Sequence, residues 1–150
     1  MQMSRTNLVF PGLSSLYDKL FPLALTLLRV VVGIMFLVHV SAKFQAGAAA
    51  VAANVFAKNG LEPALAMTYV VMFLEVVGGA CLVLGLFTRF FAAALAIEML
   101  VALVFVHLSQ GYAASAGGYE YVLMIGAACF LLAITGGGPW SVDRAIGKEL

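Results

Sequence analysis

The sequence is poor in charged residues, since only 10% of its 150 residues are Asp, Glu, Lys or Arg, against about 25% in a soluble domain. Eight basic and seven acidic residues give a formal net charge of +1, which excludes the basic surface of a nucleic-acid-binding protein. Apolar residues take the place of charge: 64% of the chain is hydrophobic, and its mean hydropathy is +1.09. Such a composition cannot cover a water-exposed surface. We therefore predict a single integral membrane domain over residues 1–150, with the lipid bilayer as its partner.

Cysteine and histidine are equally scarce, with two of each. Cys81 and Cys129 form no C-x-x-C pair, which argues against a disulfide relay and favours a packing role. The chain has no glycine-rich nucleotide loop, no G-x-S-x-G elbow and no H-E-x-x-H motif. No metal site is predicted from motifs. The two histidines, His39 and His107, leave a haem or metal site open as a minor alternative.

Four apolar segments are long enough to span a membrane, which takes about 20 residues of α-helix. They cover about residues 22–44, 64–86, 89–108 and 118–135. Gly85 is expected to stop the second helix and Thr88 to cap the third, while the run Gly136–Pro139 ends the fourth. The predicted fold is an all-α integral membrane four-helix bundle.

The connections between these spans carry helical signals of their own. Apolar residues recur at helical spacing between Pro11 and Pro22, which predicts a short interfacial helix at the N-terminus. The Ala-rich stretch 45–58 predicts an interfacial or partly re-entrant helix in the first outer loop, with a stop at Gly60. The uncharged stretch 109–118 is expected either to be mobile or to fold back into the bundle.

The distribution of basic residues predicts the orientation. Positive charge favours the cytoplasmic side, and one predicted face holds most of it, whereas the other holds Lys58 with Lys43 at its edge. Both termini are therefore expected in the cytoplasm, in the cytoplasmic (inner) membrane of a bacterium or archaeon. The basic residues on the cytoplasmic face are Arg5, Lys19, Arg89, Arg144 and Lys148.

Polar residues at membrane depth are the candidate functional residues, because a charge in hydrocarbon is costly unless it is paired or hydrated. At about 1.5 Å of rise per residue, most of them fall in the outer half of the membrane. Arg29 and Glu98 lie deeper and are predicted to pair. The full set is Arg29, His39, Lys43, Glu75, Glu98, His107 and Glu120.

Position along the helices divides these candidates. Lys43, His107 and Glu120 lie near helix ends, where an interfacial or snorkelling role is the more frequent one. Glu75, Glu98 and Arg29 are harder to explain structurally, because an ion pair alone is an expensive way to fix helix packing. In a regular α-helix, Glu98 and His107 are about 180° apart, so they should not face one pocket.

Several segments resemble the DoxX family. They are LRVVVGIMFLVH (residues 28–39), FLEVVGG (73–79), LGLFTR (84–89) and GGPWSVD (137–143), within a match over about residues 24–145. The residues that match the family pattern are Arg29, His39, Lys43, Glu75, Arg89 and Glu120. The resemblance implies a small four-helix membrane subunit with a redox association, since the family takes its name from a subunit linked to quinone-dependent oxidation.

Three functions follow as hypotheses. The first is an accessory subunit of a membrane oxidoreductase system, with a quinone or similar apolar ligand in the bundle, Glu75 and Glu98 as catalytic proton carriers, and His39 bonded to the ligand. In this reading Arg29 keeps Glu98 ionised, and a redox protein is the expected partner. The second is a non-enzymatic scaffold or assembly factor. The third, a small transporter, is less favoured because the chain has no inverted repeat. Gly78 and Gly79 would allow a homo-oligomer.

Overall fold

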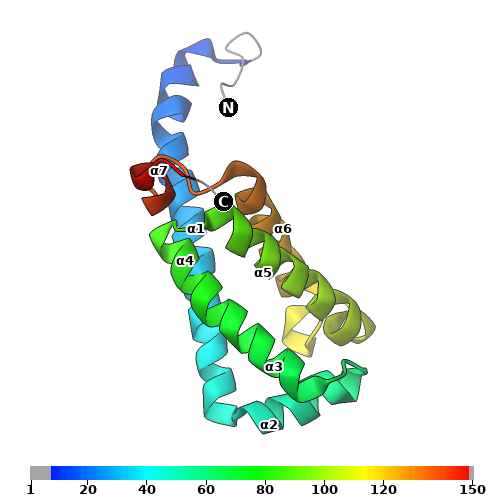
Figure 1. Cartoon of the computed structure of the whole chain (residues 1–150). Helices are drawn as coiled ribbons and strands as arrows, with labels where there is room; N and C mark the ends of the chain where they lie inside the picture. Colours follow the sequence, from blue (N-terminus) through cyan, green and yellow to red (C-terminus); the bar gives the residue numbers. More distant parts are fainter. Residues whose placement is uncertain (1–7, 149–150) are drawn as a thin grey trace.

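The structure, a computed structural model, describes residues 8–148, and within this range the chain is helical with no strand. Figure 1 shows the long helix α1 packed against α4, with α3 diverging from α1 and with α5 and α6 side by side. The main helices are α1 (Ser14–Ala46), α3 (Ala64–Phe73), α4 (Gly79–Leu84), α5 (Thr88–Ala102), α6 (Glu120–Thr135) and α7 (Val142–Ile146).

Helix α1 corrects the predicted N-terminal interfacial helix. A 3-10 turn (Pro11–Leu13) leads directly into α1, which runs without interruption through Pro22. Proline removes one hydrogen bond, to the carbonyl four residues earlier. That carbonyl belongs to Asp18 in an exposed turn, so the helix continues. A separate interfacial helix is therefore wrong within the described residues, and Arg5 lies outside them.

The loop between α1 and α3 is helical as predicted. It consists of α2 (Ala48–Val51), the π-helical segment η3 (Ala52–Phe56) and a 3-10 turn η4 (Ala57–Asn59). Gly60 ends it in a left-handed conformation, with φ of 75°. Val51, Ala52 and Phe56 pack against Ala64 at the start of α3, which ties this loop to the next helix.

Two long helices contain π-helical segments. Between α3 and α4 lies η5 (Leu74–Gly78), and after α5 comes η6 (Leu103–His107), followed by the 3-10 turn η7 (Leu108–Gln110). A π-helical turn inserts one extra residue and rotates every side chain beyond it, and such turns are frequent at functional sites. Both segments carry a candidate functional residue, Glu75 and His107 respectively.

Three helical stretches of the described chain are long and apolar enough to cross a membrane: Pro11–Ala46, Ala64–Leu84 and Thr88–Gln110. The fourth predicted span, α6, is also apolar but has 16 residues. It packs along α5 and contributes Ile125, Cys129 and Leu132 to the buried core. The chain is thus an all-helical, multi-pass membrane protein.

Glycines bring α1 and α4 into close contact. A Cβ on Gly33 would lie 2.6 Å from the Gly79 carbonyl oxygen, and one on Gly79 would lie 2.9 Å from the Gly33 carbonyl oxygen. Gly78 faces Leu95 of α5 at similarly short range. Packing within the chain thus covers both glycines, and the possible homo-oligomer stays a prediction that would need another surface.

The C-terminal segment caps the turn between α4 and α5. Gly85 ends α4 in a left-handed conformation as predicted, with φ of 73°. The expected Thr88 cap is wrong: Asp143 accepts hydrogen bonds from the backbone N–H groups of Phe87 and Thr88 at 2.7 and 2.9 Å. A carboxylate at a helix N-terminus satisfies donors that the helix itself leaves unpaired. Asp143 is itself held by α7, whose N-cap is the side chain of Ser141.

Candidate functional site

A pocket of about 390 Å³ lies at the end of the bundle away from α7, enclosed by α1, η5, α5, η6 and α6. Its volume is within the usual range for small-molecule sites. Five of the seven predicted candidates line it: His39, Lys43, Glu75, Glu98 and His107. Met35, Phe36, Met99, Val122 and Ile125 supply apolar walls. Polar groups converge here from four helical segments of an otherwise apolar chain.

Lys43 and Glu75 form the ion pair of this pocket. The Nζ of Lys43 lies 2.5 Å from Oε2 of Glu75, and the two side chains are 24% and 2% exposed. The preference for a snorkelling Lys43 is therefore corrected, because its ammonium turns toward the bundle interior. A carboxylate buried this deeply needs a cation or hydrogen bonds, and Lys43 supplies both.

Glu98 lies beside this pair. It interacts with Glu75 and with Lys43, while its Oε2 atom is buried without a hydrogen-bond partner in the described chain. One ammonium neutralises only one of two carboxylates. The pocket therefore holds a second carboxyl group with an unsatisfied oxygen, which is the kind of group that accepts a proton or a hydrogen bond from a ligand.

The predicted pairing of Arg29 with Glu98 is wrong. Arg29 is fully buried, and its guanidinium donates to the carbonyl oxygens of Leu82 (2.5 Å), Val83 (2.9 Å) and Trp140 (2.9 Å). The first two are carbonyls at the end of α4, and that of Leu82 also accepts from the N–H of Gly85 at the end of the helix. Fourteen residues, about 21 Å of helix, separate Arg29 from Lys43. Arg29 thus closes the opposite end of the bundle.

His107 faces the pocket although a regular helix would turn it away from Glu98. The reason is η6, whose π-helical turn changes the rotation between the two residues. Its Nδ1 atom lies 2.7 Å from the carbonyl oxygen of Gly117, which fixes the ring against the loop before α6. The divergence was expected of a regular helix only, and η6 is the irregularity that brings both side chains to one pocket.

His39 lies at the more exposed side of the pocket. Its ring stacks on Tyr121, with centroids 5.6 Å apart and planes inclined by 23°. Its Nδ1 atom lies 3.2 Å from the Met35 carbonyl oxygen, one turn back along α1. Tyr121 was missed by the sequence reasoning, although a tyrosine at the start of an apolar span is a recognisable signal of an interfacial polar group.

Glu120 acts on the loop before α6 and does not line the pocket. Its Oε2 atom accepts a hydrogen bond of 3.1 Å from the N–H of Ala114. The loop folds back, as one of the two sequence alternatives had it, so that Ala114, Gly117 and Gly118 line the pocket. Glu120 is therefore a positioning residue for that wall.

Metal ligands do not gather in the described part of the chain. Between residues 8 and 148, no group of three or more His, Cys, Asp and Glu side chains is arranged to hold a metal ion. The two cysteines are reduced and buried in separate helices. The pocket offers hydrogen bonding and proton exchange by carboxyl, imidazole and phenol groups next to one ammonium.

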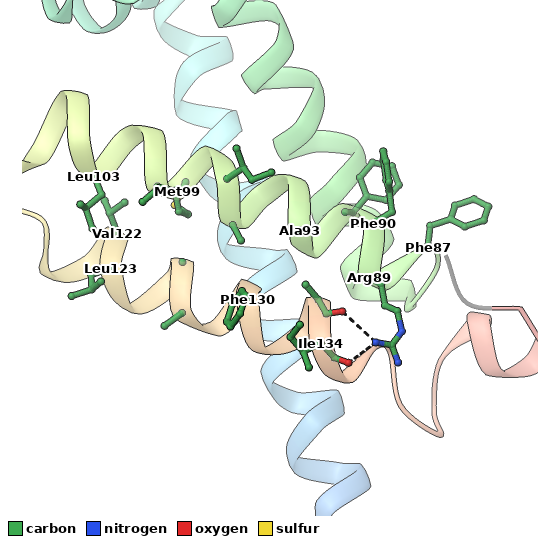
Figure 2. A pocket seen from close by; sticks show the side chains of 17 residues that line it. Phe87, Arg89, Phe90, Ala93, Met99, Leu103, Val122, Leu123, Phe130 and Ile134 are labelled. Carbon is green, nitrogen blue, oxygen red and sulfur yellow. Dashed lines mark hydrogen bonds between the residues drawn. The ribbon is translucent and has the colours of Figure 1, made fainter. Parts of the chain in front are cut away.

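A long apolar groove adjoins the pocket. It lies between α5 and α6 on the outside of the bundle, has a volume of about 1090 Å³, and is shown in Figure 2. Met99 and Val122 line both the groove and the pocket. At its far end Arg89 donates to the carbonyl oxygens of Ala133 and Ile134, which closes the end of α6 (Figure 2).

Comparisons with known proteins agree with this architecture. The DoxX family model matches residues 24–108. A Bacillus subtilis protein named "Putative oxidoreductase CatD" is 30% identical over 131 residues, covering 87% of this chain and 92% of its own length. A Haemophilus influenzae protein named "Uncharacterized protein" is 32% identical over 137 residues, covering 88% and 97%. No solved structure is significantly similar. With its helical fold, its membrane-length helices and this match over more than half of its length, the chain belongs to the DoxX family.

Proposed function

We propose that this protein is a small membrane subunit of a redox system that binds a quinone-type ligand in the pocket around Glu75 and Glu98. The observation that carries the proposal is the convergence of two carboxyl groups, one ammonium and two imidazoles on a single cavity within an apolar bundle. The name of the Bacillus subtilis relative supports a redox context. Reduction of a quinone takes up two electrons and two protons, so its site needs groups that exchange protons.

The residues present fit such a ligand. Apolar walls suit the ring, and the buried, unpartnered Oε2 atom of Glu98 can exchange a proton or a hydrogen bond with it. The adjoining groove suits an isoprenoid tail, because Met99 and Val122 connect it to the pocket and its lining is almost entirely apolar. In this proposal Glu75 and Glu98 relay protons, His39 and His107 bond to the ligand, and Lys43 holds Glu75 through its ion pair.

The proposed topology has four spans with both termini in the cytoplasm, so that α6 crosses the membrane as the fourth helix. At 1.5 Å per residue, its 16 residues reach about 24 Å. This is short of the roughly 30 Å hydrocarbon core, and local thinning of the bilayer accommodates such a mismatch at modest cost. The pocket then lies in the outer half of the cytoplasmic membrane.

The test is a binding experiment on the full chain in mild detergent. Short-tailed ubiquinone and the corresponding ubiquinol are each titrated calorimetrically, without oxygen, into wild type, Glu98→Gln and the matched control Glu62→Gln, an exposed carboxylate in a loop away from the pocket. We expect Glu98→Gln to weaken binding of the tighter-binding form roughly tenfold and Glu62→Gln to leave it unchanged. Equal affinity in all three proteins, or none in wild type, would contradict the proposal. Mass spectrometry of the purified protein then shows which small molecule accompanies it from the membrane.

A second function, a non-enzymatic scaffold, is favoured by the Lys43–Glu75 pair, since Glu75 is buried enough to fix helix packing. The two functions differ in what Glu75→Gln changes. A scaffold loses folded protein and thermal stability, whereas a ligand site loses affinity in a protein that still folds. Yield and unfolding temperature of this variant, measured beside ligand affinity, separate them.

A further inference from the structure

The hydrogen bonds around His107 determine which of its nitrogens can meet a ligand. A carbonyl oxygen only accepts hydrogen bonds, so the Nδ1 atom that lies 2.7 Å from the Gly117 oxygen carries the proton. In the neutral ring the other nitrogen, Nε2, is then an acceptor. No hydrogen-bond partner for Nε2 occurs within residues 8–148, and the ring lines the pocket.

The same reasoning applies to His39. Its Nδ1 atom bonds to the carbonyl oxygen of Met35, and stacking on Tyr121 holds the ring plane. Its Nε2 atom is therefore a second acceptor at the pocket. Main-chain carbonyls thus set both imidazoles in the same tautomer, with the acceptor nitrogen available to a ligand.

Glu98 provides a third acceptor. Its buried Oε2 atom has no partner in the described chain. Glu98 also interacts with Glu75, and in an ionised carboxylate, as in a carboxyl group whose proton faces Glu75, the outer oxygen of Glu98 is an acceptor. The donors at the pocket are the hydroxyl of Tyr121 and the ammonium of Lys43, and the ammonium is already engaged by Glu75 and has only its remaining N–H groups to offer.

We propose that this pocket recognises the reduced, dihydroxy form of its ligand, a quinol, in preference to the quinone. The inference rests on the proposed function and specifies the form that binds. The two carbonyl groups of a quinone only accept hydrogen bonds, whereas the two hydroxyl groups of a quinol donate them. Three acceptors, on His39, His107 and Glu98, complement donors, and an acceptor left unpaired among apolar groups weakens binding.

The experiment compares three probes that share one ring and one short tail: ubiquinol-1, ubiquinone-1 and the dimethyl ether of ubiquinol-1. The ether keeps the shape of the quinol but has no hydroxyl donors. Each is titrated anaerobically into the full chain in detergent, with binding measured by calorimetry. We expect the quinol to bind at least about tenfold more tightly than both the quinone and the ether.

Two variants connect this preference to the histidines. His39→Phe keeps an aromatic ring against Tyr121 and removes the acceptor, and His107→Phe does the same beside the loop. In either variant the quinol should lose affinity while the quinone changes little, so that the preference shrinks. Unfolding temperatures of both variants identify any loss that comes from misfolding.

The outcomes separate the inference from the function on which it rests. If the quinone or the ether binds as tightly as the quinol, the preference is wrong and the proposed quinone-type site stands. If none of the three probes binds to folded wild-type protein, the proposed function is wrong as well. A quinol preference that survives in both histidine variants would overturn the role given to the imidazoles.

Discussion

Individual buried polar residues in this bundle have two different tasks. Arg29 and Asp143 are almost fully buried and bond to main-chain groups at helix ends. Glu75 and Lys43 bond to each other, and Glu98 keeps an oxygen without a partner. The first kind of residue satisfies main-chain hydrogen-bonding groups, whereas the second keeps a hydrogen-bond acceptor available to a ligand. This difference in bonding identifies the site better than burial or charge does.

Arg29→Gln tests the structural assignment. A shorter, neutral side chain cannot reach carbonyls on both α4 and the C-terminal segment, so we expect a loss of about 2–4 kcal/mol in stability. The folded fraction should bind ligand as wild type does, because Arg29 does not line the pocket. Thermal unfolding in detergent checks the first expectation and a ligand titration the second. Weakened binding at unchanged stability would place Arg29 at the site after all.

The sequence could identify these residues but could not assign their partners. Depth along a helix placed Arg29 near Glu98, yet a guanidinium also bonds to main-chain carbonyls, and no side-chain pattern marks those. Lys43 was taken as interfacial because its partner Glu75 is 32 residues away on another helix. The cap from Asp143 crosses more than 50 residues for the same reason. Contacts between distant segments depend on helix rotation, which composition does not determine.

Helices in this molecule deviate from regularity where the site is built. η5 and η6 place Glu75 and His107 on the pocket, and a regular α-helix would rotate the second of them away. Helix ends were predictable, because Gly60, Gly85 and Gly136 have positive φ and end their helices as expected. The π-helical turns were not predictable, because polar and apolar residues hardly alternate along an apolar membrane helix and an inserted residue therefore leaves no sign in the sequence.

The contact between α1 and α4 should be sensitive to a single methyl group. Gly33→Ala would place its Cβ 2.6 Å from the Gly79 carbonyl oxygen, so the two helices must separate. We expect a loss of about 1–3 kcal/mol in the free energy of unfolding. Gly12→Ala is the matched control, since nothing lies within 4 Å of its Cβ. Equal stability of the two variants would show that this contact is not tight in solution.

The groove between α5 and α6 should distinguish ligands by their tails. Gly126→Leu adds a side chain to the groove, next to Met99. We expect it to lower the affinity for a long-tailed ubiquinone roughly tenfold and to leave that for tail-less 2,3-dimethoxy-5-methylbenzoquinone unchanged. Val70→Phe, an exposed position on α3 away from the groove, is the control. An equal loss for both ligands would mean that the tail does not lie in this groove.

The molecule as a whole has two unlike ends. At one end α7 and two arginines close the helices, and at the other a pocket with unsatisfied acceptors lies beneath a helical loop. The apolar segments predicted from hydropathy nearly coincide with the observed helices, because the length of each apolar segment can be counted in the sequence. Helix α6 has only 16 residues, whereas a membrane span takes about 20, so its length alone does not determine whether it crosses the membrane.

Labelling of single cysteines tests the proposed topology. In a Cys81→Ala/Cys129→Ala background, Ser109→Cys lies before α6 and Lys148→Cys after it, and both positions are exposed. We expect a membrane-impermeant maleimide to label Ser109→Cys from outside intact cells and Lys148→Cys only in inverted vesicles. Labelling of both from one side would mean that α6 does not span. Reversed sides would overturn the orientation alone.

The bonds made by the C-terminal segment also bear on how the protein is synthesised. Trp140 accepts from Arg29 and Asp143 caps α5, so groups on the first and third membrane-length helices obtain their final partners from residues that are synthesised after both helices. During insertion, the guanidinium of Arg29 is already inside the first helix while its last acceptor is still in the ribosome. A nascent chain halted before Trp140 therefore holds an incompletely bonded charge, and its turn at Gly85–Thr88 lacks a cap. Protease sensitivity at this turn would report how far synthesis had proceeded.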